Sequence, residues 1–279
     1  MCETCGCGGG EVKIEGEHHH EHEHEHVLAD GTVVRHAHHD HGHHHDHDHH
    51  HHHDHEHAHE DVALEVKILE KNDRIAAENR GFLRGRGVVA LNLMSSPGSG
   101  KTTLLEKTLA TLLAEQRRVY VLEGDQETTR DADRIRATGA RALQINTGKG
   151  CHLEAEMVRR GLDGLGLEPG GILFIENVGN LVCPALFDLG ESARVVLFSV
   201  TEGEDKPLKY PHMFRAADLV IMTKIDLLPH LDFDLARAHA AVQEVKPGTP
   251  VMELSARSGQ GMPAFAAWVL DRAASAKSR

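Results

Sequence analysis

The chain has 279 residues and a formal net charge of −13. The charge is concentrated in residues 1–60, which hold 14 acidic residues but only Lys13 and Arg35 as bases, so nothing indicates a nucleic-acid-binding face on the rest. The chain contains no run of 18 apolar residues and begins with no basic, apolar leader. We therefore expect a cytoplasmic protein without a nucleic-acid or membrane partner.

The first residues carry a cluster of thiols. Three of the five cysteines are Cys2, Cys5 and Cys7, and they are separated mainly by small residues. Three thiolates and the N-terminal amine together suit square-planar Ni(II), whereas tetrahedral Zn(II) and Cu(I) also favour sulfur. We predict a metal chelate here, and a reactive cluster without a metal is the alternative.

A histidine tract follows. All but four of the 26 histidines lie between His18 and His59, interleaved with Asp and Glu. Because neutral imidazole binds nickel, zinc and copper, we predict a storage segment that takes up several ions with little selectivity. An expression tag and a pH-responsive tail are the alternatives. Residues 1–60 have too few apolar side chains to offset the entropy of ordering them, which predicts a disordered tail.

The pattern of apolar residues changes after residue 60. A helical period covers residues 61–80, and Gly81, Gly85 and Gly87 are expected to break the helix. We expect this helix, within a connecting segment 61–87, to dock on the domain or on a second copy of the chain. From residue 88 to residue 279, apolar runs alternate with amphipathic segments, which predicts an α/β domain with a mostly parallel sheet of about seven strands flanked by helices. The expected strands are 88–94, 119–123, 142–146, 172–175, 195–200, 219–222 and 251–254, and the expected helices include 104–116, 131–138 and 264–276.

A phosphate-binding loop is predicted between the first strand and the first helix of this domain. Glycines in the loop let several backbone N–H groups point at a phosphate, next to the positive end of the following helix. Lys101 would reach the β and γ phosphates, and the Thr102 hydroxyl would bind Mg²⁺. The nucleotide-binding residues of the loop are Pro97, Gly98, Ser99, Gly100, Lys101, Thr102 and Thr103, with Ser95 where such loops usually begin with glycine. The α/β domain is thus expected to be a P-loop NTPase.

The choice of base is predicted by a motif after the sixth strand. Thr223-Lys224-Ile225-Asp226 resembles the Asn-Lys-x-Asp element of GTPases. The Asp226 carboxylate would accept two hydrogen bonds from guanine, and adenine offers no such pair of donors. Ser255 and Ala256, after the last strand, would support the base through their backbone. We expect GTP as the nucleotide, and an ATP-dependent partitioning or reductase protein of the same fold is an alternative.

Two acidic residues follow strands at the position expected for the γ-phosphate and Mg²⁺. Asp125 would join the Mg²⁺ shell or orient the attacking water. Glu176 opens the sequence Glu-Asn-Val-Gly, where many GTPases have Asp-x-x-Gly, and the Gly179 N–H would bind the γ-phosphate. Lys101, Asp125 and Glu176 are therefore the catalytic candidates. Because no catalytic glutamine or arginine finger can be assigned, we expect slow intrinsic hydrolysis.

Cys151, His152 and Cys183 form a second set of metal donors. Three such ligands are one short of a closed tetrahedral site, so water or a second protomer would complete it. Cys183 lies four residues after Gly179, so hydrolysis could change the ligand geometry and release the ion. The alternative is that both cysteines are small apolar residues of the core.

Four stretches together resemble the HypB family, the GTPases that serve nickel insertion into [NiFe]-hydrogenase. They are Cys2-x-x-Cys5-Gly6-Cys7 and residues 95–103, 148–152 and 176–184. The resemblance implies a GTP-dependent homodimer of the SIMIBI class of P-loop proteins, with Cys151, His152 and Cys183 in a Ni²⁺ or Zn²⁺ site at the dimer interface. It also implies a HypA-type nickel chaperone and the hydrogenase large-subunit precursor as partners. A urease-type nickel GTPase and a storage protein with an accessory GTPase are the alternatives.

Overall fold

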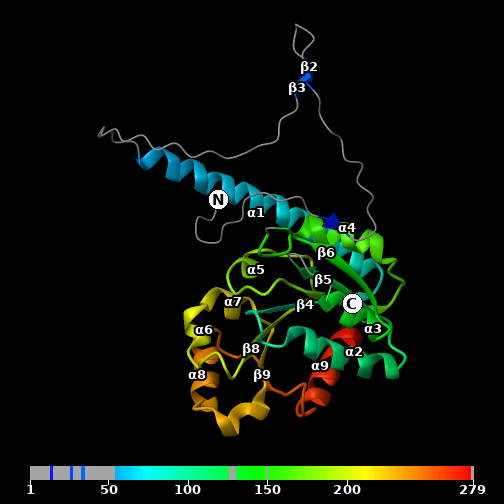
Figure 1. Cartoon of the computed structure of the whole chain (residues 1–279), viewed down its shortest axis with the longest axis vertical. Helices are drawn as coiled ribbons and strands as arrows, with labels where there is room; N and C mark the ends of the chain where they lie inside the picture. The colour runs from blue at the N-terminus through cyan, green and yellow to red at the C-terminus, as the bar shows by residue number, and fades with distance from the viewer. Residues whose placement is uncertain are drawn as a thin grey trace.

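The computed structural model describes residues 13–14, 26–27, 33–34, 54–125, 130–148 and 150–277 (Figure 1). The three short segments are strands β1 (Lys13–Ile14), β2 (His26–Val27) and β3 (Val33–Val34). The predicted disorder of the tail, the predicted cysteine chelate and most of the histidine tract lie outside the described residues. Within the described part of the chain, no helix combines the length and the apolar character needed to cross a membrane.

A sheet of parallel strands forms the centre of the domain. In chain order its strands are β4 (Val88–Ser95), β5 (Val119–Asp125), β6 (Arg141–Asn146), β7 (Gly171–Glu176), β8 (Ala193–Ser199), β9 (Leu219–Thr223) and β10 (Val251–Glu253). Their order across the sheet is β6-β5-β7-β4-β8-β9-β10, each neighbouring pair is parallel, and the short β1 pairs antiparallel with β6. The predicted fold class is confirmed.

Helices cover both faces of this sheet, and alternate residues of each strand enter different cores. The longer helices are α1 (Asp54–Gly85), α2 (Lys101–Ala114), α3 (Arg130–Ala137), α4 (Ala155–Leu165), α8 (Leu235–Val245) and α9 (Met262–Lys277). Val89 and Leu91 of β4 pack with α2, α3 and α9, whereas Val88 and Ala90 pack with α1 and α4. Near β8 and β9 the second face is covered by α8 and α7 (Pro211–Ala216). The remaining short helices are α5 (Cys183–Leu186), α6 (Lys206–Lys209) and the 3-10 helix η1 (Ile225–His230).

Helix α1 is longer at both ends than the sequence predicts. It begins at Asp54 instead of residue 61, because residues 54–60 contain no glycine or proline that would stop a helix. It also continues through Gly81, which was expected to break it. Leu83 is only 2% exposed and packs in the core beneath α1. This burial outweighs the cost of about 1 kcal/mol for a glycine within a helix.

Two buried asparagines attach α1 to the domain. Asn72 accepts a hydrogen bond from the Ala155 N–H and donates one to the Asp188 carbonyl, both at 2.8 Å. Asn79, seven residues later on the same helix face, donates to the Ala155 carbonyl at 2.8 Å and to the Leu189 carbonyl at 3.1 Å. The helix is thereby joined to the start of α4 and to the loop after α5. Its N-terminal part extends beyond the sheet and its covering helices (Figure 1).

Candidate nucleotide and metal site

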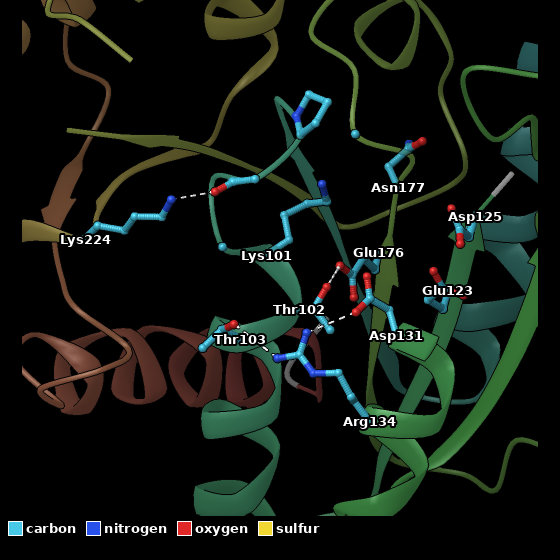
Figure 2. A pocket seen from close by; sticks show the side chains of 15 residues that line it. Lys101, Thr102, Thr103, Glu123, Asp125, Asp131, Arg134, Glu176, Asn177 and Lys224 are labelled. Carbon is cyan, nitrogen blue, oxygen red and sulfur yellow. Dashed lines mark hydrogen bonds and ion pairs between the residues drawn. The ribbon is translucent and has the colours of Figure 1, made fainter. Parts of the chain in front are cut away.

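A pocket of about 450 Å³ opens where the parallel strands end (Figure 2). It lies between the loop after β4, the end of β5 and the loop after β7. The predicted residues Pro97, Gly98, Gly100, Lys101, Thr102, Thr103, Asp125, Glu176, Gly179 and Lys224 line it together with Glu123, Gly124, Asp131, Arg134 and Asn177. The structure therefore brings the predicted phosphate-binding residues and the predicted carboxylates to one cavity.

The loop between β4 and α2 has the backbone conformation that its glycines allow. Gly98 and Gly100 have φ values of 74° and 97°, which residues with a Cβ rarely adopt. The first turn of α2 lines the pocket, so the N–H groups at the N-terminal end of this helix favour an anion there. The Lys101 Nζ donates a hydrogen bond to the Ser95 Oγ at 2.8 Å, and burial lowers the pKa of Lys101. Ser95, at the usual glycine position, thus orients the lysine.

Two buried glutamates face each other at the ends of β5 and β7. Glu123 and Glu176 are direct partners in the register of the two strands, and each has a buried Oε2 without a hydrogen-bond partner. The Thr102 hydroxyl donates to the Glu176 Oε1 at 2.7 Å. Burial, followed by the negative charges of Glu176 and Asp125, raises the pKa of Glu123 to about 9. Burial also raises the pKa of Glu176. Unsatisfied carboxylate oxygens beside a hydroxyl fit the oxygen ligands that Mg²⁺ prefers.

Arg134 of α3 lines this pocket and joins α3 to α2. It donates to the Asp131 carboxylate at 3.0 Å and to the Thr103 hydroxyl at 3.2 Å (Figure 2). It also donates to the Glu106 carboxylate at 2.7 Å. The hydrogen bond to Glu106 is the main reason why the pKa of Arg134 is raised. Five pocket residues were not predicted from the sequence: Glu123, Gly124, Asp131, Arg134 and Asn177. For Glu123 a signal was present, since it is an acidic residue directly after four apolar residues of a buried strand.

A second, mostly apolar pocket of about 230 Å³ adjoins the first. The two pockets share Gly100, Thr103 and Lys224. The second is lined by Ser99, Gly100, Thr103, Leu104, Thr223, Lys224, Asp226, Leu227, Leu254, Ser255, Ala256 and Arg257, which include the residues predicted to recognise the base. The Asp226 Oδ1 accepts a hydrogen bond from the Ser255 hydroxyl at 2.6 Å. This contact orients the carboxylate that was predicted to select guanine.

The base loop also holds the phosphate loop in place. The Lys224 Nζ donates to the Gly98 carbonyl at 2.6 Å, and the Thr223 hydroxyl donates to the Ser99 carbonyl at 2.7 Å. Thr223 stands where GTPases usually have asparagine. The threonine side chain is shorter than that of asparagine, but its hydroxyl still joins the two loops by a hydrogen bond.

The predicted inner metal ligands also come together. The donor atoms of Cys151, His152 and Cys183 all lie within 4.8 Å of one another, and neither cysteine is in a disulfide. The His152 ring stacks on Phe187 with a centroid distance of 4.0 Å. Its Nε2 lies 3.7 Å from the Glu154 carboxylate, beyond hydrogen-bond distance, and the nearby His152 ring lowers the pKa of Glu154. Two thiols and an imidazole at this spacing fit Ni²⁺ or Zn²⁺, and metal binding by these residues stays a prediction.

The likeness to known proteins covers the domain that contains these sites. The sequence profile of the family described as CobW/HypB/UreG, nucleotide-binding domain, matches residues 89–253. The hydrogenase maturation factor HypB of Azotobacter chroococcum mcd 1 is 60% identical over 208 residues, which are 75% of this chain and 68% of that protein. The chain belongs to the HypB family. The HypB of Escherichia coli (strain K12) is 55% identical to this HypB-family chain over 206 residues, which are 74% of this chain and 71% of the relative.

Two solved HypB structures have the same fold. The structure of HypB from Helicobacter pylori in complex with nickel matches with a TM-score of 0.70 and 44% identity. The match covers 74% of this chain and 96% of the Helicobacter pylori chain. The structure of HypB from Archaeoglobus fulgidus has a TM-score of 0.68 and 37% identity, and covers 74% of this chain and all of that one, at 100%. The resemblance expected from the four motifs is confirmed, and this HypB-family chain is a P-loop protein of a nucleotide-hydrolysing class.

Proposed function

We propose that the chain is a Mg²⁺-dependent GTPase that stores nickel and delivers it for [NiFe]-hydrogenase maturation. The observation that carries the proposal is the loop from Glu176 to Cys183. Its first residue lines the phosphate pocket, and its last is one of the three clustered metal donors. Relatives named as hydrogenase maturation factors, and a relative solved with nickel, support the destination and the metal.

In the proposed reaction, each part of the pocket has one role. The backbone of the loop 97–100 and the Lys101 ammonium hold the β and γ phosphates, and the Asp226 carboxylate selects guanine. Thr102, Glu176 and Asp125 would hold Mg²⁺, which neutralises charge on the phosphate oxygens when it is bound. Asp125 is our candidate for orienting the attacking water. Lys101 and Glu176 complete the catalytic set.

The metal role is proposed for the inner cluster and for the tail. Cys151, His152 and Cys183 would hold the transferred Ni²⁺, with Zn²⁺ as a competitor for the same donors. Val182 and Leu186, which flank or follow Cys183, are 50% and 53% exposed. Exposed apolar side chains beside an incomplete ligand set fit a GTP-dependent homodimer in which the second copy closes the site. A HypA-type chaperone and the hydrogenase large-subunit precursor are the proposed partners, in the cytoplasm.

Nickel transfer from the full-length chain to an acceptor chelator tests this function. We expect the transfer rate to differ between GTP, GDP and no nucleotide, because the nucleotide changes the ligand geometry. Lys101→Ala retains every metal ligand but loses the contact to the terminal phosphates, so its rate should not respond to GTP. Equal rates in all three conditions would refute the proposal. Normal hydrogenase maturation by Lys101→Ala would favour a storage protein with an accessory GTPase.

A further inference from the structure

The segment from Glu176 to Gly179 is in contact with the phosphate loop. The Gly179 backbone approaches Pro97 so closely that a Cβ added to Gly179 would lie 3.2 Å from the Pro97 Cα and 3.3 Å from its nitrogen. Both residues line the nucleotide pocket. A phosphate bound in this pocket would therefore lie beside both backbones, and a change in their spacing would move the Glu176–Gly179 segment.

Asn177 joins this same segment to the loop that carries two metal donors. Its side chain is 1% exposed and lines the nucleotide pocket (Figure 2). The Asn177 Oδ1 accepts hydrogen bonds from the Leu153 N–H at 3.2 Å and from the Val178 N–H at 3.0 Å. Leu153 directly follows His152. The amide of Asn177 is therefore a direct polar contact between the phosphate side and the Cys151–His152 side.

Leu153 is held from a second direction. Its side chain is fully buried and packs on Gly124, where an added Cβ would lie 2.8 Å from the Leu153 Cγ. Gly124 lies between the two acidic residues at the end of β5, Glu123 and Asp125. With its side chain fixed on β5 and its N–H fixed by Asn177, Leu153 has little freedom to move independently of the nucleotide pocket.

Two further hydrogen bonds of Asn177 fix its orientation. The Asn177 Nδ2 donates to the Asn92 Oδ1 at 3.4 Å, and the Asn92 Nδ2 donates to the buried Glu191 carboxylate at 3.2 Å. The Asn177 backbone N–H donates to the Leu93 carbonyl of the central strand at 3.0 Å. Asn177 is thus supported from the sheet, with its oxygen directed at the metal-bearing loop.

We propose that Asn177 is a positioning residue that couples the terminal phosphate of the nucleotide to the metal donors Cys151 and His152. A shift of the Glu176–Gly179 segment changes the hydrogen bond to the Leu153 N–H and moves the two donors relative to Cys183, which lies four residues after Gly179. This inference rests on the proposed nickel function and names the residue that regulates it. Linkage requires the coupling to be reciprocal, so nickel changes the affinity for GTP by the same factor as GTP changes the affinity for nickel.

The test measures nickel affinity of the inner cluster in the full-length chain. Substituting Cys2, Cys5 and Cys7 by serine leaves Cys151 and Cys183 as the remaining cysteines, since the chain has five. Nickel–thiolate charge-transfer absorption then reports the inner cluster and not the histidines. In this parent we expect the nickel dissociation constants with GDP and with a non-hydrolysable GTP analogue to differ by about 5- to 100-fold. In Asn177→Ala their ratio should fall to within about twofold of one.

Two further variants separate coupling from folding. Asn177→Asp keeps an acceptor oxygen for the Leu153 and Val178 N–H groups but loses the donor to Asn92, so it should restore part of the ratio. Asn180→Ala removes a hydrogen bond of 2.9 Å from the Val182 N–H in the same loop but no contact to Leu153, so its ratio should match that of the parent. If Asn177→Ala does not fold, Asn177→Ser serves instead, because its side chain is too short to reach Leu153.

The outcomes distinguish this inference from the proposed function. A parent protein whose nickel affinity does not depend on nucleotide overturns the proposed function. A parent with strong dependence that Asn177→Ala and Asn177→Ser retain overturns the role of Asn177 and leaves the function intact. Loss of the ratio in Asn180→Ala as well would show that the loop as a whole, and not the Asn177 contact, carries the coupling.

Discussion

Glu123 and Glu176 lie opposite each other with two unsatisfied oxygens. A buried carboxylate oxygen without a partner destabilises a fold, so two such oxygens near the ends of neighbouring strands indicate a functional site and not a packing solution. The Glu123 carboxyl holds its proton to a pH far above the usual range for glutamate, because burial raises its pKa to about 9. A cation that binds between the two carboxylates would displace this proton.

Replacing Glu123 by glutamine should change how stability depends on pH. In the unfolded chain the carboxyl releases its proton near pH 4.5, whereas in the folded chain it holds the proton up to pH about 9. Between these values the folded state binds more protons, so its stability falls as pH rises. Glu123→Gln removes this loss. Without nucleotide or Mg²⁺, its free energy of unfolding in urea should exceed that of wild type by an amount that grows from pH 5 to pH 8.5, on the order of a few kcal/mol. A difference independent of pH would contradict this assignment.

At the scale of elements, the attachment of α1 gives a prediction about stability. Asn79→Ala removes the donor for the buried Ala155 and Leu189 carbonyls. Leaving these groups unsatisfied should cost about 2–3 kcal/mol in urea unfolding. The control is Lys71→Ala on the same helix, which removes an exposed ion pair with Glu156 at 2.8 Å. That loss should be much smaller than the loss in Asn79→Ala, because an exposed ion pair is screened by solvent. Equal effects of the two variants would mean that the asparagine does not anchor the helix.

The strands were predicted well because helices bury both faces of the sheet, which makes strands such as β5, β7 and β9 nearly continuous apolar runs. Helix α8 was not predicted, although its buried residues Ala238, Ala241 and Val242 have the spacing of one helix face. The predicted ends of α1 were wrong because the apolar pattern is shorter than the helix at both ends. Tertiary packing of Leu83 then overrides the glycine signal.

The residues of the candidate site likewise fall into those that the sequence predicts and those that it does not. Residues within one motif, such as Lys101 and Asp226, could be identified from spacing alone. Glu123 stands out only as an acidic residue within an apolar strand, and neither its partner nor the role of Asn177 could be identified, because both depend on which strands are neighbours. Insertion of β7 between β4 and β5 brings Glu176 opposite Glu123, and no local pattern predicts strand order.

At the scale of the whole molecule, storage and transfer should be separable by deletion. Removal of residues 18–53 takes away most of the histidine tract but leaves α1, which begins at Asp54. We expect the number of nickel ions per chain to fall by several in equilibrium dialysis at neutral pH, with a thiolate-bound ion retained. In the full chain, the same capacity should fall steeply near pH ~6 as imidazoles become protonated. An unchanged stoichiometry after deletion would refute storage by the tract.

The hydrogen bonds from Thr223 and Lys224 to the phosphate loop have one more consequence for the molecule. They fix the loop's backbone before any nucleotide arrives, so binding does not have to supply the entropy of ordering it. Preorganisation of this kind leaves more of the binding free energy for motion elsewhere in the protein. The base-binding loop and the phosphate loop therefore form one rigid unit. The segment after β7 is the part of the pocket that can move when the nucleotide binds.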